Sequence, residues 1–193
     1  MQKRVFLIHG WDSHKDAKCF PWLKKELEGQ GYRVEALSMP TPLEPKIDTW
    51  VPFLADKIGT PNENTFLLGH SIGAQTVLRY LEQLKEDEKI GGAVLLAGWL
   101  HLTDETFEDE EDKEIAKPWL ETPIDWGKVR SHTDKFTAIF SDDDPFVPFS
   151  DSTIFADKLG AEIITEHGKG HFSDDNEVKE LPSALSAIRE IAE

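Results

Sequence analysis

Short apolar runs alternate with longer amphipathic stretches along most of this chain. The apolar runs predict six strands, at Val5–Ile8, Arg33–Ser38, Thr65–Leu68, Ala93–Ala97, Phe136–Phe140 and Ala161–Thr165. Apolar residues spaced three and four apart predict helices over about Asp16–Gln30, Thr49–Ile58, Ile72–Leu84, Ser150–Leu159 and Asn176–Ile191. This alternation indicates an α/β protein with about six mostly parallel strands and helices on both faces of the sheet.

One acidic segment breaks the pattern. Eight of the twelve residues in Thr103–Glu114 are acidic, which is typical of a solvated, partly mobile loop or helix face. A lid is the alternative, because Trp119 and Trp126 follow and need something to pack against. Residues 99–126 are therefore predicted to form an insertion or a small lid within a single domain, 1–193.

Charge and cysteine content narrow the range of partners. The chain has 193 residues with 21 Lys+Arg and 37 Asp+Glu, a net charge of −16, which disfavours nucleic acid and anionic membranes as partners. A single cysteine, Cys19, rules out an internal disulfide and a Cys-based zinc site. The apolar run near the N-terminus is too short for a signal peptide, and no run could span a bilayer, so we expect a cytoplasmic location.

The segment Gly69-His70-Ser71-Ile72-Gly73 matches the pattern G-x-S-x-G between a predicted strand and a predicted helix. In that context the motif forms a strained turn that exposes the Ser71 hydroxyl beyond the sheet. Gly69 and Gly73 avoid collisions at the sharp corner, and His70 is expected to support the turn by packing. The alternative is an ordinary turn in which Ser71 caps the helix.

A serine nucleophile needs a base and an acid, and this motif's partners follow it in the order Asp or Glu, then His. The predicted strand 136–140 leads into three aspartates, of which Asp144 is favoured because Pro145 and Pro148 stiffen the loop beyond it. Asp142 and Asp143 are then interpreted as turn and helix-cap residues. The last predicted strand leads to His171, which we favour as the base, and to His167, which is the alternative.

Attack on a substrate carbonyl creates a negatively charged oxygen, which two backbone N–H groups usually stabilise. One of these groups follows the serine, and the loop after the first strand is expected to supply the other. We predict that the backbone N–H groups of Trp11 and Ile72 hold the oxyanion. Aromatic residues near the strand ends, namely Trp11, Trp99, Phe146 and Phe172, are predicted to line an apolar substrate pocket. A metal site of His9, His14 and the three aspartates is a weaker alternative, because no H-E-x-x-H motif is present. We expect neither a metal nor an organic cofactor.

Five segments together carry a family resemblance: Ile8–Trp11, Phe20–Leu27, Gly69–Ala74, Asp143–Pro148 and Gly170–Phe172. With them, nearly the whole chain resembles the small serine hydrolases related to retinoblastoma-binding protein 9 and the bacterial YdeN proteins. The resemblance implies a three-layer α/β-hydrolase fold with little or no cap, and a triad of Ser71, Asp144 and His171. It also implies serine hydrolase activity, most often toward esters.

These observations predict a serine hydrolase that cleaves a small ester, or an amide or thioester, through an acyl-enzyme. The rival interpretation is a binding or scaffold protein on a hydrolase fold, since fold alone does not establish activity. Binding to the retinoblastoma protein is not predicted, because that motif is L-x-C-x-E and Cys19 has Ala17 and Pro21 at the flanking positions.

Overall fold

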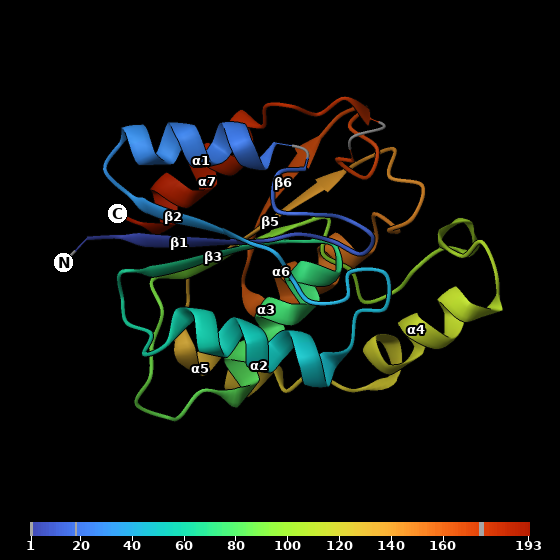
Figure 1. Cartoon of the computed structure of the whole chain (residues 1–193), viewed down its shortest axis with the longest axis horizontal. Coiled ribbons are helices and arrows are strands. Elements are labelled where there is room, and N and C mark those ends of the chain that lie inside the picture. The colour runs from blue at the N-terminus through green and yellow to red at the C-terminus, as the bar shows by residue number, and fades with distance from the viewer. Residues whose placement is uncertain (1, 18, 174–175) are drawn as a thin grey trace.

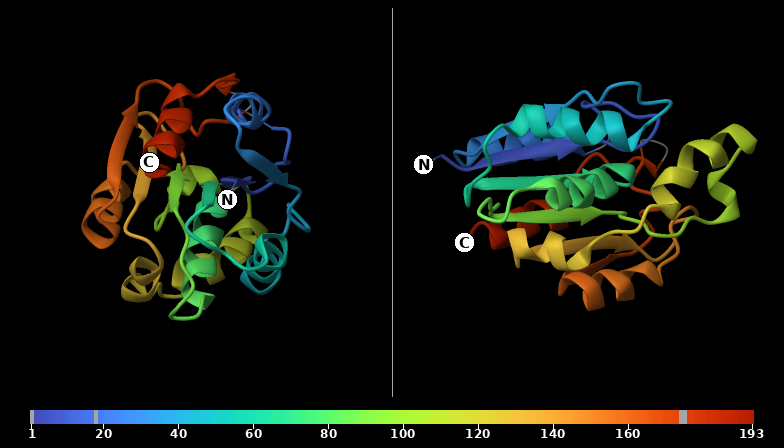
Figure 2. Two further views of the ribbon diagram at one scale, coloured as in Figure 1. Left: turned by 90° about the vertical axis from the view of Figure 1, so that its left-hand side faces the viewer. Right: turned by 90° about the horizontal axis from the view of Figure 1, so that it is seen from below.

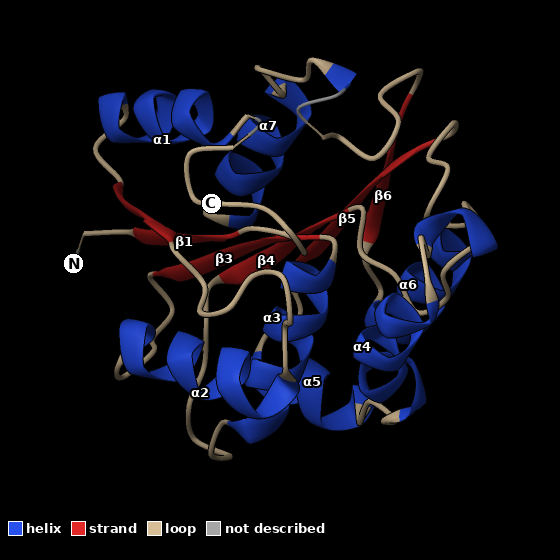
Figure 3. Ribbon diagram, turned by 45° about the vertical axis from the view of Figure 1, so that its right-hand side comes forward, coloured by secondary structure: helices blue, strands red, loops and turns tan. Residues whose placement is uncertain are grey.

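The computed structural model of the chain describes residues 2–17, 19–173 and 176–193. Its centre is one six-stranded sheet (Figures 1 and 3). The strands are β1 (Arg4–Ile8), β2 (Arg33–Leu37), β3 (Thr65–His70), β4 (Gly92–Leu96), β5 (Phe136–Ser141) and β6 (Glu162–Glu166). Their order across the sheet is β2-β1-β3-β4-β5-β6, and all neighbouring pairs are parallel. The predicted α/β class and three-layer α/β-hydrolase fold are confirmed.

Helices cover both faces of this sheet (Figure 3). On one face lie α1 (Phe20–Gly29) and α7 (Pro182–Ile191). On the other lie α2 (Ile47–Ile58), α3 (Ile72–Gln83), α5 (Trp126–His132) and α6 (Asp151–Leu159). Every residue of β3, β4 and β5 is buried. These strands are mostly apolar because helices exclude water from both of their faces.

Two helices begin later than their periodicity predicted. Helix α1 begins at Phe20 rather than near Asp16, and α7 begins at Pro182 rather than near Asn176. In both, a proline occupies the first turn, where its missing N–H and fixed φ are tolerated.

The segment 99–126 is part loop and part helix, the two forms that its acidic composition indicated. A short 3₁₀ turn, η1 (Asp104–Thr106), leads into helix α4 (Glu110–Glu121). The Asp109 side chain accepts hydrogen bonds from the N–H groups of Glu111 and Asp112 and so caps α4. Helix α4 projects beyond one end of the sheet (Figures 1 and 2).

The strand register determines which loops meet at that end. Ile8 pairs with Gly69, Gly69 with Leu95, Leu95 with Ala138, and Ala138 with Ile163. One row of pairs thus crosses five parallel strands, whose carboxyl ends all point toward the same edge of the sheet. In open parallel sheets, ligands bind beyond the carboxyl ends of the strands. A site is therefore expected among the loops that follow β1, β3, β4, β5 and β6. Within the described residues, no helix is both long and apolar enough to cross a membrane.

Candidate active site

Ser71 occupies a strained turn between β3 and α3. Its backbone has φ 55° and ψ −122°, in a region that residues with a side chain rarely adopt. The Ser71 N–H donates to the Leu96 carbonyl at 2.8 Å, which ties the turn to the end of β4. The predicted sharp strand-to-helix corner is present, with only 8% of Ser71 exposed.

Two glycines allow this turn to lie close to its neighbours. A Cβ added at Gly69 would lie 2.4 Å from the Gly73 carbonyl oxygen, across the corner. A Cβ added at Gly73 would lie 2.4 Å from the carbonyl oxygen of Ile8 and 2.7 Å from that of His9. The first glycine therefore lets the chain turn, and the second lets α3 approach β1.

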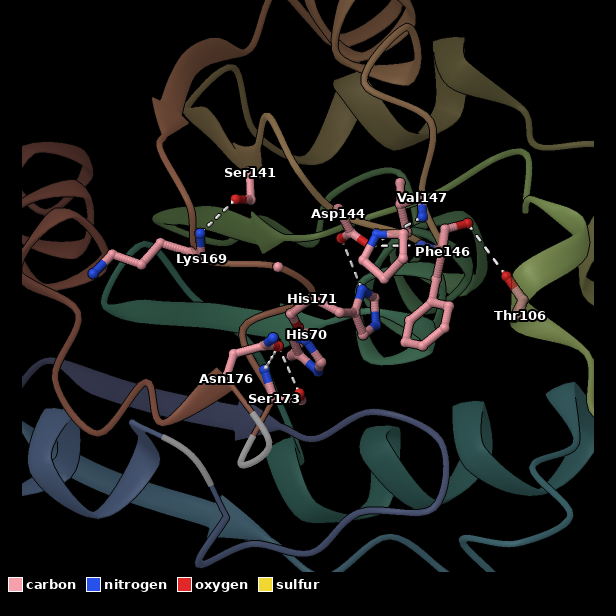
Figure 4. Close-up of polar contacts among 12 residues, drawn as sticks. His70, Thr106, Ser141, Asp144, Phe146, Val147, Lys169, His171, Ser173 and Asn176 are labelled. Carbon is pink, nitrogen blue, oxygen red and sulfur yellow. Dashed lines mark hydrogen bonds and ion pairs between the residues drawn. The ribbon is translucent and has the colours of Figure 1, made fainter.

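His171 and Asp144 form a hydrogen-bonded pair (Figure 4). The His171 Nδ1 lies 2.8 Å from the Asp144 Oδ2, and their side chains are only 12% and 3% exposed. Asp144 Oδ1 accepts the N–H groups of Phe146 at 2.9 Å and Val147 at 3.1 Å. Because a carboxylate only accepts hydrogen bonds, the His171 proton is held on Nδ1 and the lone pair remains on Nε2.

The two neighbouring aspartates have other partners. Asp142 Oδ2 lies 2.6 Å from the His167 Nδ1, and this contact together with the Gly168 N–H lowers the pKa of Asp142. Asp143 Oδ1 accepts from the Ser141 hydroxyl at 2.6 Å and from the Gly170 N–H at 2.8 Å, and these two bonds lower its pKa. Both lie in a turn, as predicted, but the helix-cap prediction is wrong because α6 begins only at Asp151.

His70 and His9 hold the backbone around the turn. The buried His70 donates from Nε2 to the His171 carbonyl oxygen at 2.9 Å, and the two rings lie 4.9 Å apart. His9 Nε2 accepts the Met39 N–H at 3.0 Å, so its proton lies on Nδ1, which donates to the Gly10 carbonyl at 2.8 Å. His70 thus does more than pack, since it fixes the loop that carries His171.

The two residues predicted to supply oxyanion donors, Trp11 and Ile72, come from different segments of the chain. Ile72 is the first residue of α3, where an N–H has no carbonyl one turn back within the helix. Trp11 follows β1, and among the described residues no hydrogen bond takes up its backbone N–H. Both residues line the same cavity as Ser71.

That cavity measures about 330 Å³ and contains Ser71, His70 and His171 in its wall. Its apolar wall consists of Trp11, Leu43, Ile72, Trp99, Leu102 and Phe146. The Phe146 ring packs edge-on against His171 at 5.3 Å (Figure 4). The structure thus brings Ser71, His171, Trp11, Trp99 and Phe146 together, as predicted.

Phe172 does not line the cavity, which corrects the prediction for that residue. Its backbone has φ 53°, and its ring is fully buried in the cluster beneath α1 and α7, with Leu181 and Ala184. His171 therefore faces the cavity, whereas the adjacent Phe172 faces the core. Trp119 and Trp126 also lie outside the cavity, packing against Trp50 and Phe155 with ring centroids 6.4 Å apart in each pair.

In the parts of the chain that the structure describes, no group of three or more His, Cys, Asp or Glu side chains is arranged to hold a metal ion. The His9 Nε2 is occupied by the Met39 N–H, so the alternative metal site that included His9 has no support.

Comparison with known proteins agrees with this geometry. The model of the serine hydrolase family matches residues 5–190. The chain belongs to the serine hydrolase family. It is 32% identical to YdeN of Bacillus subtilis (strain 168) over 188 residues, which is 97% of this chain and 95% of YdeN. It is 27% identical to serine hydrolase RBBP9 of Rattus norvegicus over 167 residues, 86% of this chain and 80% of that protein.

A solved structure supports the same assignment. The crystal structure of the B. subtilis ydeN gene product superposes with a TM-score of 0.89 at 30% identity, covering 98% of each chain. The predicted resemblance is therefore confirmed over nearly the whole length of this serine hydrolase.

Sequence reasoning missed the positioning contacts of this serine hydrolase. Asp143 fixes the N–H of Gly170, directly before His171, and His70 fixes the His171 carbonyl. His70 stands inside the G-x-S-x-G motif, and the adjacency of Asp143 to Asp144 was visible. Neither signal shows which loop, more than 25 residues away in the sequence, the side chain would contact.

The packing of α3 against β1 predicts a large cost for a methyl group at position 73. Gly73→Ala would press its Cβ against two backbone carbonyls that cannot move aside. We expect it to lower the free energy of unfolding by about 3 kcal/mol, at the upper end of overpacking costs. Urea unfolding measures this, with Gly29→Ala as the control, because a Cβ at Gly29 meets nothing within 4 Å. Equal stability of the two variants would contradict the close approach.

The Asp142 carboxylate predicts how His167 titrates. The hydrogen bond to Asp142 raises the pKa of His167 above its usual value. The stabilisation from this pair is therefore fully present below the unfolded-state pKa and is lost as pH rises through the raised pKa. In Asp142→Asn, the His167 pKa measured by NMR should fall toward the value of an unperturbed histidine, about 6.5. Asp143→Asn is the control, and an unchanged His167 pKa in Asp142→Asn would refute the coupling.

Proposed function

We propose that this serine hydrolase cleaves small carboxylic esters through a triad of Ser71, His171 and Asp144. The observation that carries the proposal is the His171–Asp144 hydrogen bond, because His171 lines one cavity together with a serine in a strained strand-to-helix turn. Membership of the serine hydrolase family supports hydrolysis in general. The ester class rests on the cavity and on the chemistry of the three side chains.

His171 has the tautomer that a general base requires. With Nδ1 protonated toward Asp144, the Nε2 lone pair is free to take the Ser71 proton as Oγ attacks the ester carbonyl carbon. The imidazolium that forms is stabilised by the Asp144 carboxylate. Two backbone N–H groups hold that carboxylate in place, so it does not need to reorient during the reaction.

The tetrahedral intermediate carries its negative charge on the former carbonyl oxygen. We assign the N–H groups of Trp11 and Ile72 to this oxygen, aided by the positive end of α3. Collapse of the intermediate breaks the bond to the alcohol, which takes the proton from His171 and leaves. Water then attacks the acyl group on Ser71 with His171 again as the base, and releases the acid.

The cavity dimensions support a small substrate. A volume of about 330 Å³ lies near the lower end of ligand pockets, for which ~300–1,000 Å³ is usual. Its apolar wall favours acyl groups with alkyl or aromatic surface. The net charge of −16 disfavours anionic esters.

The assignment of Ser71 as nucleophile predicts the outcome of covalent labelling. A fluorophosphonate probe should label the wild-type protein, and Ser71→Ala should abolish labelling and lower kcat on an activated ester by about 10⁴ or more. Ser150→Ala is the control, because Ser150 lies outside the cavity; this variant should keep both the probe labelling and the kcat of the wild-type protein. Undiminished labelling of Ser71→Ala would exclude Ser71, and an unlabelled wild type would favour the scaffold interpretation.

The three adjacent aspartates predict unequal effects on turnover. Asp144→Asn can hold the wrong His171 tautomer, so kcat should fall by up to about 10⁴. Asp142→Asn and Asp143→Asn should cost about tenfold at most, because Asn keeps an oxygen that can accept the same N–H bonds. Stopped-flow or steady-state kcat on one ester compares the three, with circular dichroism confirming that each is folded. If kcat falls mainly in Asp143→Asn, with Asp144→Asn near wild type, then Asp143 rather than Asp144 is the triad acid.

A further inference from the structure

Three carboxylates line the candidate catalytic cavity. Asp12 lies in the loop after β1, whereas Glu108 and Asp112 belong to the 99–126 segment. The described residues that line the cavity include no Lys or Arg. The charge next to the reacting groups is therefore negative, in a cavity that must admit a substrate.

The acidic segment is attached to the loop that carries Asp144. Thr103 donates its N–H to the Phe146 carbonyl at 2.9 Å and its hydroxyl to the Pro145 carbonyl at 2.5 Å. The Thr106 hydroxyl donates to the same Phe146 carbonyl at 3.3 Å (Figure 4). The start of the segment is thus fixed relative to His171.

The far end of the segment is anchored in the core. The buried Arg79 donates through Nη2 to the carbonyls of Trp119 and Thr122, each at 2.9 Å. The Trp119 indole N–H donates to the Pro45 carbonyl at 3.0 Å. Both ends of the segment that carries Glu108 and Asp112 are thus held by hydrogen bonds.

The carboxylates in the cavity wall keep their charge available. Asp112 Oδ2 accepts the Glu108 N–H at 2.8 Å, which orients the Asp112 side chain. Among the described residues, no Lys or Arg forms an ion pair with Asp12, Glu108 or Asp112, whereas Lys113 on the same helix pairs with Glu110. The negative charge at the cavity is thus not neutralised from within the described chain.

Two further features of the cavity indicate the ligand. Ser71 is 92% buried, and its Oγ has no hydrogen-bond partner among the described residues, so it is open to a molecule in the cavity. The rings of Trp11, Trp99 and Phe146 form part of the same wall. Aromatic faces attract organic cations as well as apolar groups.

We propose that this hydrolase selects esters that carry an organic cation, such as a substituted ammonium group, which the carboxylates of Glu108, Asp112 and Asp12 attract while the aromatic wall contacts its alkyl groups. The inference rests on the proposed function and adds its substrate class. Charges of one sign that line a cleft raise the local concentration of an oppositely charged substrate.

Matched ester pairs test this preference. One pair is the methyl esters of γ-(trimethylammonio)butanoic acid and of its carbon isostere, in which tert-butyl replaces trimethylammonium. The other is the acetate esters of choline and of its carbon isostere. Each kcat/KM is divided by the rate constant for hydrolysis by hydroxide, which removes intrinsic reactivity. For at least one pair we expect the cationic ester to be favoured by about tenfold or more at low salt.

Salt and substitutions locate the source of the preference. The ratio of the normalised kcat/KM values, cationic over neutral ester, should decrease toward one as the salt concentration rises to 1 M, where the screening length falls to about 3 Å. Glu108→Gln and Asp112→Asn should each reduce the ratio by about two- to fivefold, as expected for single partly exposed charges. Glu105→Gln is the matched control. It removes the same charge from the same segment, but its side chain does not line the cavity.

The outcomes separate this inference from the proposed function. Equal normalised rates for both members of both pairs overturn the inference and leave ester hydrolysis standing. A preference that Glu105→Gln reduces as much as Glu108→Gln also overturns it, because the general surface charge would then be responsible. If wild-type protein hydrolyses none of the esters, the proposed function fails. Dissociation constants of the same pairs for Ser71→Ala, from titration calorimetry, then decide the inference without turnover.

Discussion

The close approach of the Ser71 turn to β1 is the constraint on which the site depends. The turn places Ser71 at a left-handed φ of 55°, and Gly73 brings the first turn of α3 against the carbonyls of Ile8 and His9. This contact sets the distance between the serine and the loop after β1. A serine hydroxyl and a backbone N–H from another strand can then face one cavity without any flexible side chain to position them.

The loops around this turn hold one another in place through backbone contacts. The carbonyl of His171 accepts from His70, and the N–H of Gly170 donates to Asp143. Asp144 in turn is held by two N–H groups of its own loop. His70 and Asp143 thus hold the loop that carries His171, and backbone N–H groups hold the Asp144 carboxylate, which keeps the His171–Asp144 pair in one orientation.

The loop after β5 contacts both His171 and the acidic segment that forms part of the cavity wall. Phe146 packs its ring against His171, and its carbonyl accepts from Thr103 and Thr106 at the start of the acidic segment. Its N–H group is bonded to Asp144. A change in this short loop would therefore alter both the orientation of His171 and the position of the carboxylates that line the cavity.

The sequence by itself determined the strands, most helices, and the order of Ser71, Asp144 and His171. Alternation of apolar runs with amphipathic stretches fixes an α/β class, and a G-x-S-x-G motif at a strand end has few other structural uses. Local patterns did not reveal that Phe172 faces the core while His171 faces the cavity, or that the acidic segment lies in the cavity wall. Those outcomes depend on contacts between residues far apart in the chain, such as Thr103 with Pro145 and Arg79 with Trp119. Only the tertiary structure decides them, because the partners of a side chain are fixed by packing rather than by its sequence neighbours.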